Sequence, residues 1–339
     1  EFGDNETLGR LVEEAHKRGI RVMLDAVFNH CGYQHPFWQD VLKKGKDSEY
    51  YDCFYVLDES MPVFDGEIVD GLPQEVPRER LKYRPFAYTP AMPKWNTGNP
   101  KVRNYLMDAA CYWVEQYHID GWRLDVSNEV SHDFWREFRK RIKAVNSDVY
   151  ILGENWDNPW LQGDQFDAVM NYEFAMPVWN YFKKDEKGSF IYAAKEFRNG
   201  VSKVLTSYPR HVARNMFNLL ESHDTERILH RTNGDIEMAK LAYIFLFTFP
   251  GAPCVYYGGE IGMRGGEHSN RQCMIWDPKE QNQELSQFVR EMIELRKNHD
   301  SFRTAQFQWL NQEETEECLM FKKIGKKETL YVFMQKEGE

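Results

Sequence analysis

Hydrophobic and polar positions follow one another along this chain in two recurring patterns. Residues 5–18 place apolar side chains every three or four positions and end at Gly19, which is typical of an amphipathic helix. Residues 20–27 (IRVMLDAV) are almost continuously apolar, as a strand buried on both faces of a parallel sheet should be. The repetition of such strands and helices predicts βα units joined by right-handed crossovers.

The same alternation continues to about residue 300. Further strands are expected at residues 119–126, 149–153, 166–170, 215–220 and 253–257, and further helices at 101–117, 132–145, 190–205, 235–249 and 285–298. Together with residues 20–27 these make six strands, whereas a closed (β/α)₈ barrel has eight. We therefore expect the first two strands and one helix to lie upstream of residue 1. Such an N-terminally truncated fragment would expose sheet edges, and we expect it to be inactive or to aggregate when isolated.

Two segments depart from this alternation. Residues 31–98 are rich in proline, glycine and aromatic residues and are too long for a simple loop, which predicts an inserted subdomain after the third barrel strand. Beyond residue 300 the pattern becomes strict alternation, as in residues 329–334 (TLYVFM), which is typical of an antiparallel sheet. We therefore expect an α/β protein. An incomplete (β/α)₈ TIM-barrel catalytic domain would occupy residues 1–300, and the start of an all-β C-terminal domain residues 301–339.

Composition and charge exclude several classes of protein. Hydrophobic residues make up 42% of the 339 positions, so the chain can form a packed core and is not disordered. The net charge of −10 disfavours binding to nucleic acid or an anionic membrane, and the longest apolar run, residues 241–249, is too short to cross a bilayer. The six cysteines are widely spaced without a C-x-x-C pair. We expect them to be buried free thiols in a reducing, cytoplasmic compartment.

Polar residues gather where the predicted strands end, which is where parallel barrels carry their functional groups. The residues concerned are Asp25, Asn29 and His30, then Arg123 and Asp125, then Glu154, then His223 and Asp224. Arg123 and Asp125 are two positions apart and therefore share one strand face, where the arginine keeps the aspartate ionised. An ionised, oriented carboxylate is what a glycosidic nucleophile requires. A purely structural ion pair is the alternative for this pair taken alone.

These residues resemble the α-amylase family of glycoside hydrolases. Four stretches match the patterns of the family in its order, namely residues 25–30 (DAVFNH), 121–125 (GWRLD), 153–154 (GE) and 222–224 (SHD). Two more, residues 92–96 (MPKWN) and 126–129 (VSNE), are similar to the MPKLN and VANE signatures of the neopullulanase, cyclomaltodextrinase and maltogenic amylase subgroup. The resemblance covers nearly the whole chain and implies a glycoside hydrolase with this barrel fold.

The resemblance also implies a role for each residue. Asp125 would be the nucleophile, Glu154 the general acid and base, and Asp224 a second carboxylate that binds the sugar and stabilises the transition state. The residues expected to contact that sugar, the nucleophile or the acceptor are Asp25, His30, Arg123, His223, Asn128, Glu129, Trp156 and Trp95. For each of the two tryptophans, stacking on a sugar and burial in the core are equally open. A retaining mechanism predicts that the carboxyl groups of Asp125 and Glu154 lie about 5–5.5 Å apart.

The implied activity is retaining hydrolysis of α-1,4-glucosidic bonds by double displacement through a covalent glycosyl-aspartate. The implied substrates are cyclodextrins, pullulan, malto-oligosaccharides or starch, with α-1,6 cleavage and transglycosylation as further reactions and a homodimer for the full-length protein. Alternatives are an α-amylase or oligo-1,6-glucosidase of the same family, or a non-catalytic amylase-like domain. The chemistry requires no cofactor. Calcium is left open, because Asn29 offers one of the 6–8 oxygens that calcium prefers.

The chain departs from the resembled subgroup at a few positions. Gly259, in residues 256–260 (YYGGE), stands where the subgroup usually has aspartate, and we expect a weakened salt bridge or loop contact there. Trp95 replaces a leucine. Asn155 and Asp157, on either side of Trp156, replace an aliphatic residue and a histidine, which predicts an altered acceptor preference.

Overall fold

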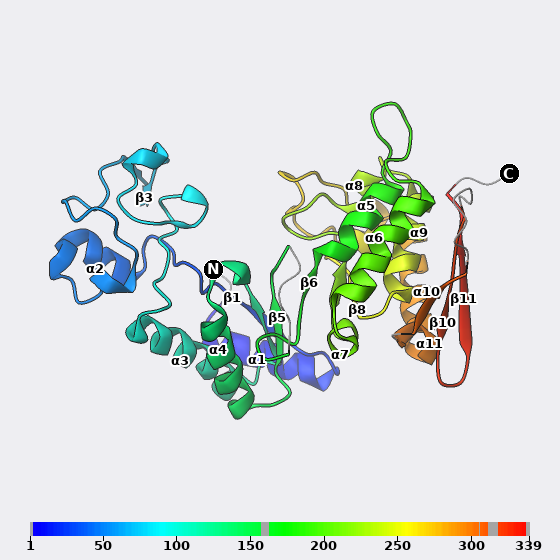
Figure 1. Ribbon diagram of the computed structural model, residues 1–339, viewed down its shortest axis with the longest axis horizontal. Coiled ribbons are helices and arrows are strands. Elements are labelled where there is room, and N and C mark those ends of the chain that lie inside the picture. The colour runs from blue at the N-terminus through cyan, green and yellow to red at the C-terminus, as the bar shows by residue number, and fades with distance from the viewer. Residues whose placement is uncertain (1–2, 157–162, 305, 311–317, 337–339) are drawn as a thin grey trace. The chain divides into compact units, whose positions relative to one another are not determined.

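The computed structural model describes residues 3–156, 163–304, 306–310 and 318–336, which form two compact units (Figure 1). The first unit comprises residues 1–154 with 163–166, and the second comprises residues 155–162 with 167–339. Each unit contains a three-stranded parallel sheet covered by helices. In the described part of the chain, no helix has the length and apolar character needed to cross a membrane.

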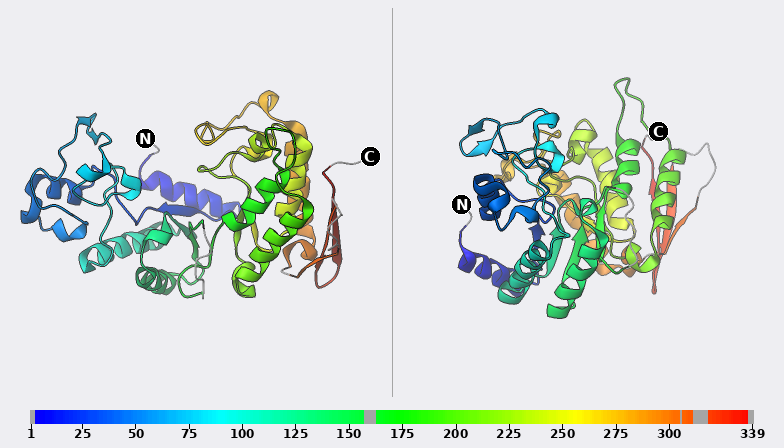
Figure 2. Two further views of the ribbon diagram at one scale, coloured as in Figure 1. Left: turned by 45° about the horizontal axis from the view of Figure 1, so that its top comes forward. Right: turned by 60° about the vertical axis from the view of Figure 1, so that its left-hand side comes forward.

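The parallel sheet of the first unit has the strand order β1 (Met23–Ala26), β4 (Gly121–Leu124), β5 (Tyr150–Gly153). Its helices are α1 (Asn5–Lys17), α3 (Pro100–Tyr117) and α4 (His132–Val145), and α3 and α4 pack side by side (Figure 2). Parallel neighbours need a crossover connection, so the predicted order of strand and helix leads directly to this arrangement. The three strands and three helices lie where the sequence pattern places them, within about two residues at most ends.

Helix α4 shows why the local sequence folds as it does. The hydroxyl of Ser131 accepts a hydrogen bond from the backbone N–H of Phe134 and so caps the first turn. Phe134, Phe138 and Ile142 recur at helical spacing and are fully buried. Burying each such side chain contributes about 1.5–3 kcal/mol, so the apolar face of this helix anchors it to the unit.

Residues 31–98 form a segment with its own aromatic core. It contains α2 (Pro36–Lys44), the short 3₁₀ turns η1 (Gly45–Asp47), η2 (Tyr51–Cys53), η3 (Arg78–Arg80) and η4 (Phe86–Tyr88), and the strand pair β2 (Ile68–Val69) and β3 (Leu72–Pro73). Trp38 packs against Tyr83 with ring centroids 4.5 Å apart, and Phe54 stacks on Trp95 at 4.6 Å. The segment returns to the end of β1, where the backbone N–H of Trp95 donates to the carbonyl of Asn29.

The second unit has a parallel sheet in the order β6 (Ala168–Asn171), β7 (Phe217–Leu219), β8 (Ala252–Cys254). Its helices are α5 (Tyr172–Phe182), α6 (Ala194–Ser207), α7 (Arg210–Ala213), α8 (Ile228–Arg231), α9 (Ile236–Thr248), α10 (Gln283–Asn298) and α11 (Asp300–Arg303), with 3₁₀ turns η6 (Gly259–Ile261) and η7 (Pro278–Glu280). An antiparallel sheet follows, ordered β11 (Thr329–Met334), β10 (Leu319–Ile324), β9 (Phe307–Trp309), which confirms the predicted change of pattern.

The structure differs from the expectations for one helix, one strand and the cysteines. Helix α5 was not predicted, because it is apolar almost all round and contains Pro177, so it shows no amphipathic period. Strand β1 is not buried on both faces: Asp25 within it is exposed, and Ile20 and Val27 beside it are 56% and 43% exposed, as befits the edge position of β1 among the described strands. The expectation of buried thiols holds only for Cys31 and Cys53, because Cys111, Cys254 and Cys318 are half-buried and Cys273 is exposed.

Lys323 in β10 offers a stability test. Its side chain is fully buried and donates to the carbonyl of Phe302, and burial, with Arg296 nearby, lowers its pKa to about 6. An unfolded chain keeps this lysine protonated up to about pH 10.4, so stability should rise with pH between about 6 and 10. Lys323→Met should remove that slope and raise the free energy of unfolding at pH 7 by about 2–4 kcal/mol.

The measurement is urea unfolding at pH 6.5, 8 and 9.5. Lys322→Met is the matched control, because Lys322 is the next residue on the same strand and is half-buried. It should leave the slope unchanged. A Lys323→Met variant less stable than the wild type at pH 7 would contradict the prediction.

Candidate active site

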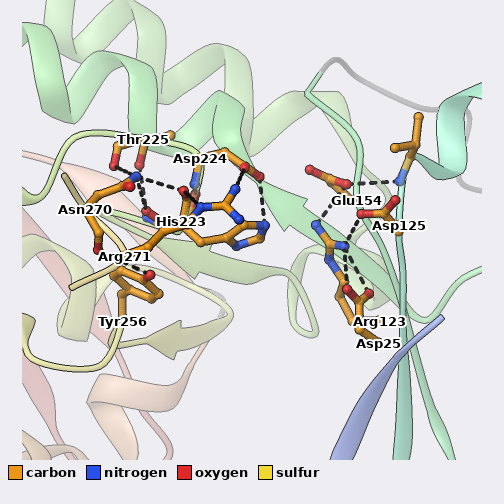
Figure 3. Close-up of polar contacts among 12 residues, drawn as sticks. Asp25, Arg123, Asp125, Glu154, His223, Asp224, Thr225, Tyr256, Asn270 and Arg271 are labelled. Atoms are coloured by element: carbon orange, nitrogen blue, oxygen red, sulfur yellow. Dashed lines mark hydrogen bonds and ion pairs between the residues drawn. The ribbon is translucent and has the colours of Figure 1, made fainter. Parts of the chain in front are cut away.

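Arg123 contacts three carboxylates at the ends of neighbouring strands in the first unit (Figure 3). Its Nη1 lies 2.6 Å from Asp125 Oδ1 and 3.0 Å from Asp25 Oδ1, and its Nη2 lies 2.8 Å from Glu154 Oε2. The arginine and Glu154 are buried, while Asp25 is half exposed at its side chain. One guanidinium group therefore binds the carboxylates predicted to be the nucleophile and the general acid.

Strand register produces this cluster. Asp25 on β1 lies directly opposite Arg123 on β4, and side chains two positions apart on a strand share a face, which brings Asp125 to the same side. The ladder extends past the strand ends, because the N–H of Asp125 donates to the carbonyl of Ala26 and that of Glu154 to the carbonyl of Leu124. The predicted common face of Arg123 and Asp125 is confirmed by their contact.

The residues after Asp125 hold Glu154 from the other side. Val126 adopts a left-handed conformation with φ 46° and ψ 42°, which is strained for a β-branched residue. This conformation directs its backbone N–H to Glu154 Oε2 at 3.0 Å. The hydroxyl of Ser127 donates to the Glu154 carbonyl at 2.9 Å. The local strain thus serves to orient the carboxylate.

Burial and neighbouring charges shift the pKa values of Arg123 and His30. Burial lowers the pKa of Arg123, but the charges of Asp25 and Glu154 and the hydrogen bonds outweigh it, and the net result is a pKa raised above its ordinary value. His30 is buried with its ring stacked on Phe86 at 4.8 Å. Burial lowers its pKa more than the nearby Asp125 and Glu129 raise it. His30 is therefore neutral near pH 7, with one ring nitrogen as donor and the other as acceptor.

A second polar cluster lies after β7 in the second unit (Figure 3). Asp224 Oδ2 lies 3.0 Å from His223 Nε2, and Asp224 Oδ1 lies 2.8 Å from Arg271 Nη2. Buried Asn270 donates from Nδ2 to the carbonyls of His223 and Thr225, each at 2.8 Å. Sequence reasoning found His223 and Asp224 but missed Arg271 and Asn270, since no motif marks residues that act through a long loop.

The residues expected around the acceptor have different surroundings. Trp156 stacks on Tyr172 with ring centroids 3.7 Å apart and is 42% exposed. Glu129 is held by Lys94 at 2.7 Å, and both line a pocket of about 470 Å³ together with Asn128. Trp95 borders the same pocket, but it is 2% exposed and packs in the aromatic core. We therefore do not assign Trp95 a sugar contact. Asp157 lies outside the described residues.

Comparison with known proteins decides the family. Residues 1–318 match the family described as alpha amylase, catalytic domain. The chain belongs to the alpha-amylase family. It is 46% identical to a cyclomaltodextrinase of Geobacillus thermopakistaniensis (strain MAS1), covering 100% of this chain and 55% of the relative. It is 41% identical to an intracellular maltogenic amylase of Bacillus subtilis (strain 168), covering 98% and 54%. Other relatives are named maltogenic alpha-amylase and neopullulanase 2.

The structural comparison agrees with the sequence. A solved cyclomaltodextrinase structure superposes with a TM-score of 0.89 at 45% identity, covering 98% of this chain and 55% of that chain. This likeness confirms the fold class and the subgroup predicted from the motifs. This alpha-amylase family chain spans about half the length of the curated relatives it matches.

The family site was tested for a calcium ion. Asn29 is fully buried, and its Oδ1 has no hydrogen-bond partner among the described residues, which suits a calcium ligand. However, the described residues contain no group of three or more His, Cys, Asp or Glu arranged to hold a metal ion. One amide oxygen does not make a site for a cation that prefers 6–8 oxygens. Calcium binding stays open, and it enters no step of the reaction.

Proposed function

We propose that this alpha-amylase family protein hydrolyses α-1,4-glucosidic bonds of α-glucans with retention of configuration. The observation that carries the proposal is the contact of one buried arginine with both Asp125 and Glu154, which makes the two carboxyl groups neighbours. Retaining glycosidases place the two carboxyl groups about 5–5.5 Å apart, which is the separation that we expect for Asp125 and Glu154, whereas inverting enzymes separate them further to admit a water molecule.

We choose the attacking atom from the contact that Asp125 makes with Arg123. Arg123 contacts Oδ1 of Asp125, so Oδ2 is the oxygen that attacks the anomeric carbon and forms the glycosyl-enzyme bond. The glycosidic bond breaks as Glu154 donates a proton to the leaving oxygen. Glu154 then removes a proton from water, whose oxygen displaces Asp125 and releases the sugar.

We assign Asp224 the third catalytic role on the basis of its family motif and its own surroundings. His223 and Arg271 each contact one of its carboxylate oxygens, which keeps the carboxylate oriented. A fixed negative charge stabilises the positive charge that develops on the sugar ring in the transition state. Arg123, Asp25, His30 and His223 would contact the same sugar or the nucleophile. Asn128, Glu129 and Trp156 would contact the acceptor part of the chain.

The proposed substrates are cyclodextrins, pullulan, malto-oligosaccharides and starch, with α-1,6 cleavage and transglycosylation as further reactions. Relatives named cyclomaltodextrinase, maltogenic alpha-amylase and neopullulanase 2 support this range. The partly exposed indole of Trp156 supports a role in stacking on an acceptor sugar. We also propose a homodimer in the cytoplasm. The Bacillus subtilis relative named intracellular maltogenic amylase supports the compartment, as do cysteines that form no disulfide among the described residues.

The test is sugar release by the full-length protein from β-cyclodextrin, pullulan and soluble starch, with the first product's anomeric form followed by proton NMR. We expect β-cyclodextrin to be opened faster than starch is cleaved, and the first product to appear as the α-anomer. A β-anomer as first product would overturn the retaining mechanism. A well-folded protein silent on all three substrates would favour a non-catalytic amylase-like domain.

A further inference from the structure

Residues 221–228 form the loop that leaves β7 and carries His223 and Asp224. The carboxylate of Glu221 joins the two ends of this loop, because its Oε2 accepts a hydrogen bond from the backbone N–H of Ile228 at 2.5 Å. Asn270 binds the carbonyls along the other side of the loop. Glu221 is therefore the side chain that closes the base of the turn holding Asp224.

The same carboxylate occupies the space beside Gly259 in η6. A Cβ atom at position 259 would lie 1.8 Å from Glu221 Oε1 and 2.8 Å from Tyr243 Oη, so no larger residue fits while Glu221 keeps this position. The weakened salt bridge or loop contact expected at Gly259 stays a prediction. A carboxylate is present at this point, and it comes from the loop after β7 rather than from the loop after β8.

Glu221 is shielded from solvent and lies among polar side chains. It is 3% exposed, and burial raises its pKa to about 7, with Arg227 lowering and Glu260 raising the value. The groups that face it come from four elements: Arg227 from its own loop, Glu260 from η6, Tyr243 from α9 and Cys254 from β8. Arg227 in turn donates from Nη1 to the carbonyl of Tyr257. Glu221 thus lies at the contact of the two loops that follow β7 and β8.

We propose that Glu221 is a positioning residue. Its carboxylate fills the space beside Gly259, where no side chain is present, and so fixes the loop that carries His223 and Asp224. The role rests on the proposed function, in which Asp224 contacts the sugar. Glu221 does not touch the substrate in this assignment and acts on the reaction through the placement of Asp224.

The first experiment separates the structural pairing from catalysis. Urea unfolding is measured for Gly259→Ala, Glu221→Ala and the double variant. Gly259→Ala should destabilise the wild type, because the new methyl group meets the Glu221 carboxylate. In the Glu221→Ala background the same change should lose most of its effect, because the obstructing oxygen is gone. An equal loss of stability in both backgrounds would overturn the pairing, whether or not the protein is an active hydrolase.

The second experiment tests the positioning role with β-cyclodextrin as substrate. Glu221→Ala should lower kcat by about 10- to 100-fold, the scale of a misplacement of about 1 Å, with a smaller change in KM. Glu221→Gln keeps an oxygen for the Ile228 N–H and should stay within about threefold of the wild type. In an Asp224→Asn background, Glu221→Ala should change kcat by less than about threefold, because both variants act through the same carboxylate.

Val289→Ala, in the buried face of α10, is the control for a purely destabilising change. It should lower stability but leave kcat unchanged in both backgrounds. The positioning role would be overturned if Glu221→Ala lowered kcat by the same factor in the wild-type and Asp224→Asn backgrounds. It would also be overturned if the Glu221→Ala variant kept the wild-type kcat. A full-length wild-type protein without activity, by contrast, would overturn the proposed function, and the stability cycle would then decide the pairing.

Discussion

Replacing Asp125 with asparagine is expected to lower the rate of α-glucan hydrolysis by about 10⁴-fold or more. The amide is nearly the same size as the carboxylate, so Arg123 keeps a partner oxygen at that position and the fold should be retained. The amide cannot form the covalent glycosyl intermediate, so the double displacement loses its first step. The measurement is release of reducing sugar from β-cyclodextrin, with folding checked by circular dichroism and urea unfolding.

Asp133→Asn is the matched control for this prediction. Asp133 lies in the same unit in the first turn of α4, its side chain is 82% exposed, and it forms an i,i+3 ion pair with Arg136. We expect less than a twofold change in its rate, because an exposed pair of this kind contributes little. If Asp125→Asn kept activity within tenfold of the wild type, another group would have to be the nucleophile, and the assignment of the site would be wrong.

Arg123→Met should affect both stability and catalysis. Removing the guanidinium group leaves buried Glu154 and partly buried Asp125 without their cationic partner, which we expect to cost about 2–4 kcal/mol of stability. Asp25 adds less, because its side chain is half exposed. The remaining folded protein should lose about 10²–10³-fold in kcat, since neither carboxylate is held in place. Urea unfolding and kcat on β-cyclodextrin measure the two effects.

Arg136→Met provides the comparison for Arg123→Met. Arg136 also contacts two carboxylates, those of Asp133 and Asp164, but its side chain is 37% exposed. Water screens these pairs, so we expect a stability change below about 1 kcal/mol and no change in kcat. Equal losses of stability and kcat for the two arginine variants would contradict the prediction, because they would show that Arg123 contributes no more than an exposed arginine.

The hydrophobic pattern predicted most of the strands and helices, because the buried positions of each element recur with a regular period within a short stretch of sequence. Helix α4 was predicted with the bounds that the structure has, since its cap at Ser131 and its aromatic positions are all encoded nearby. Helix α5 was missed because a helix buried on nearly all sides has no polar face to reveal its period. The exposure of Leu11 on α1, at 60%, was also not predicted, because a periodic pattern cannot say what covers an apolar face.

The sequence by itself determined the family, the order of strands and the identity of the acidic residues at the strand ends. These follow from short motifs and from the rule that side chains two positions apart share a strand face. Only the tertiary structure decided which groups contact them. It placed Asp25 against Arg123 across 98 positions and Arg271 against Asp224 across 47. It buried Trp95 in a core, and it filled the space beside Gly259 with the carboxylate of Glu221. Contacts of this kind depend on the packing of segments far apart in the chain, which a local pattern does not encode.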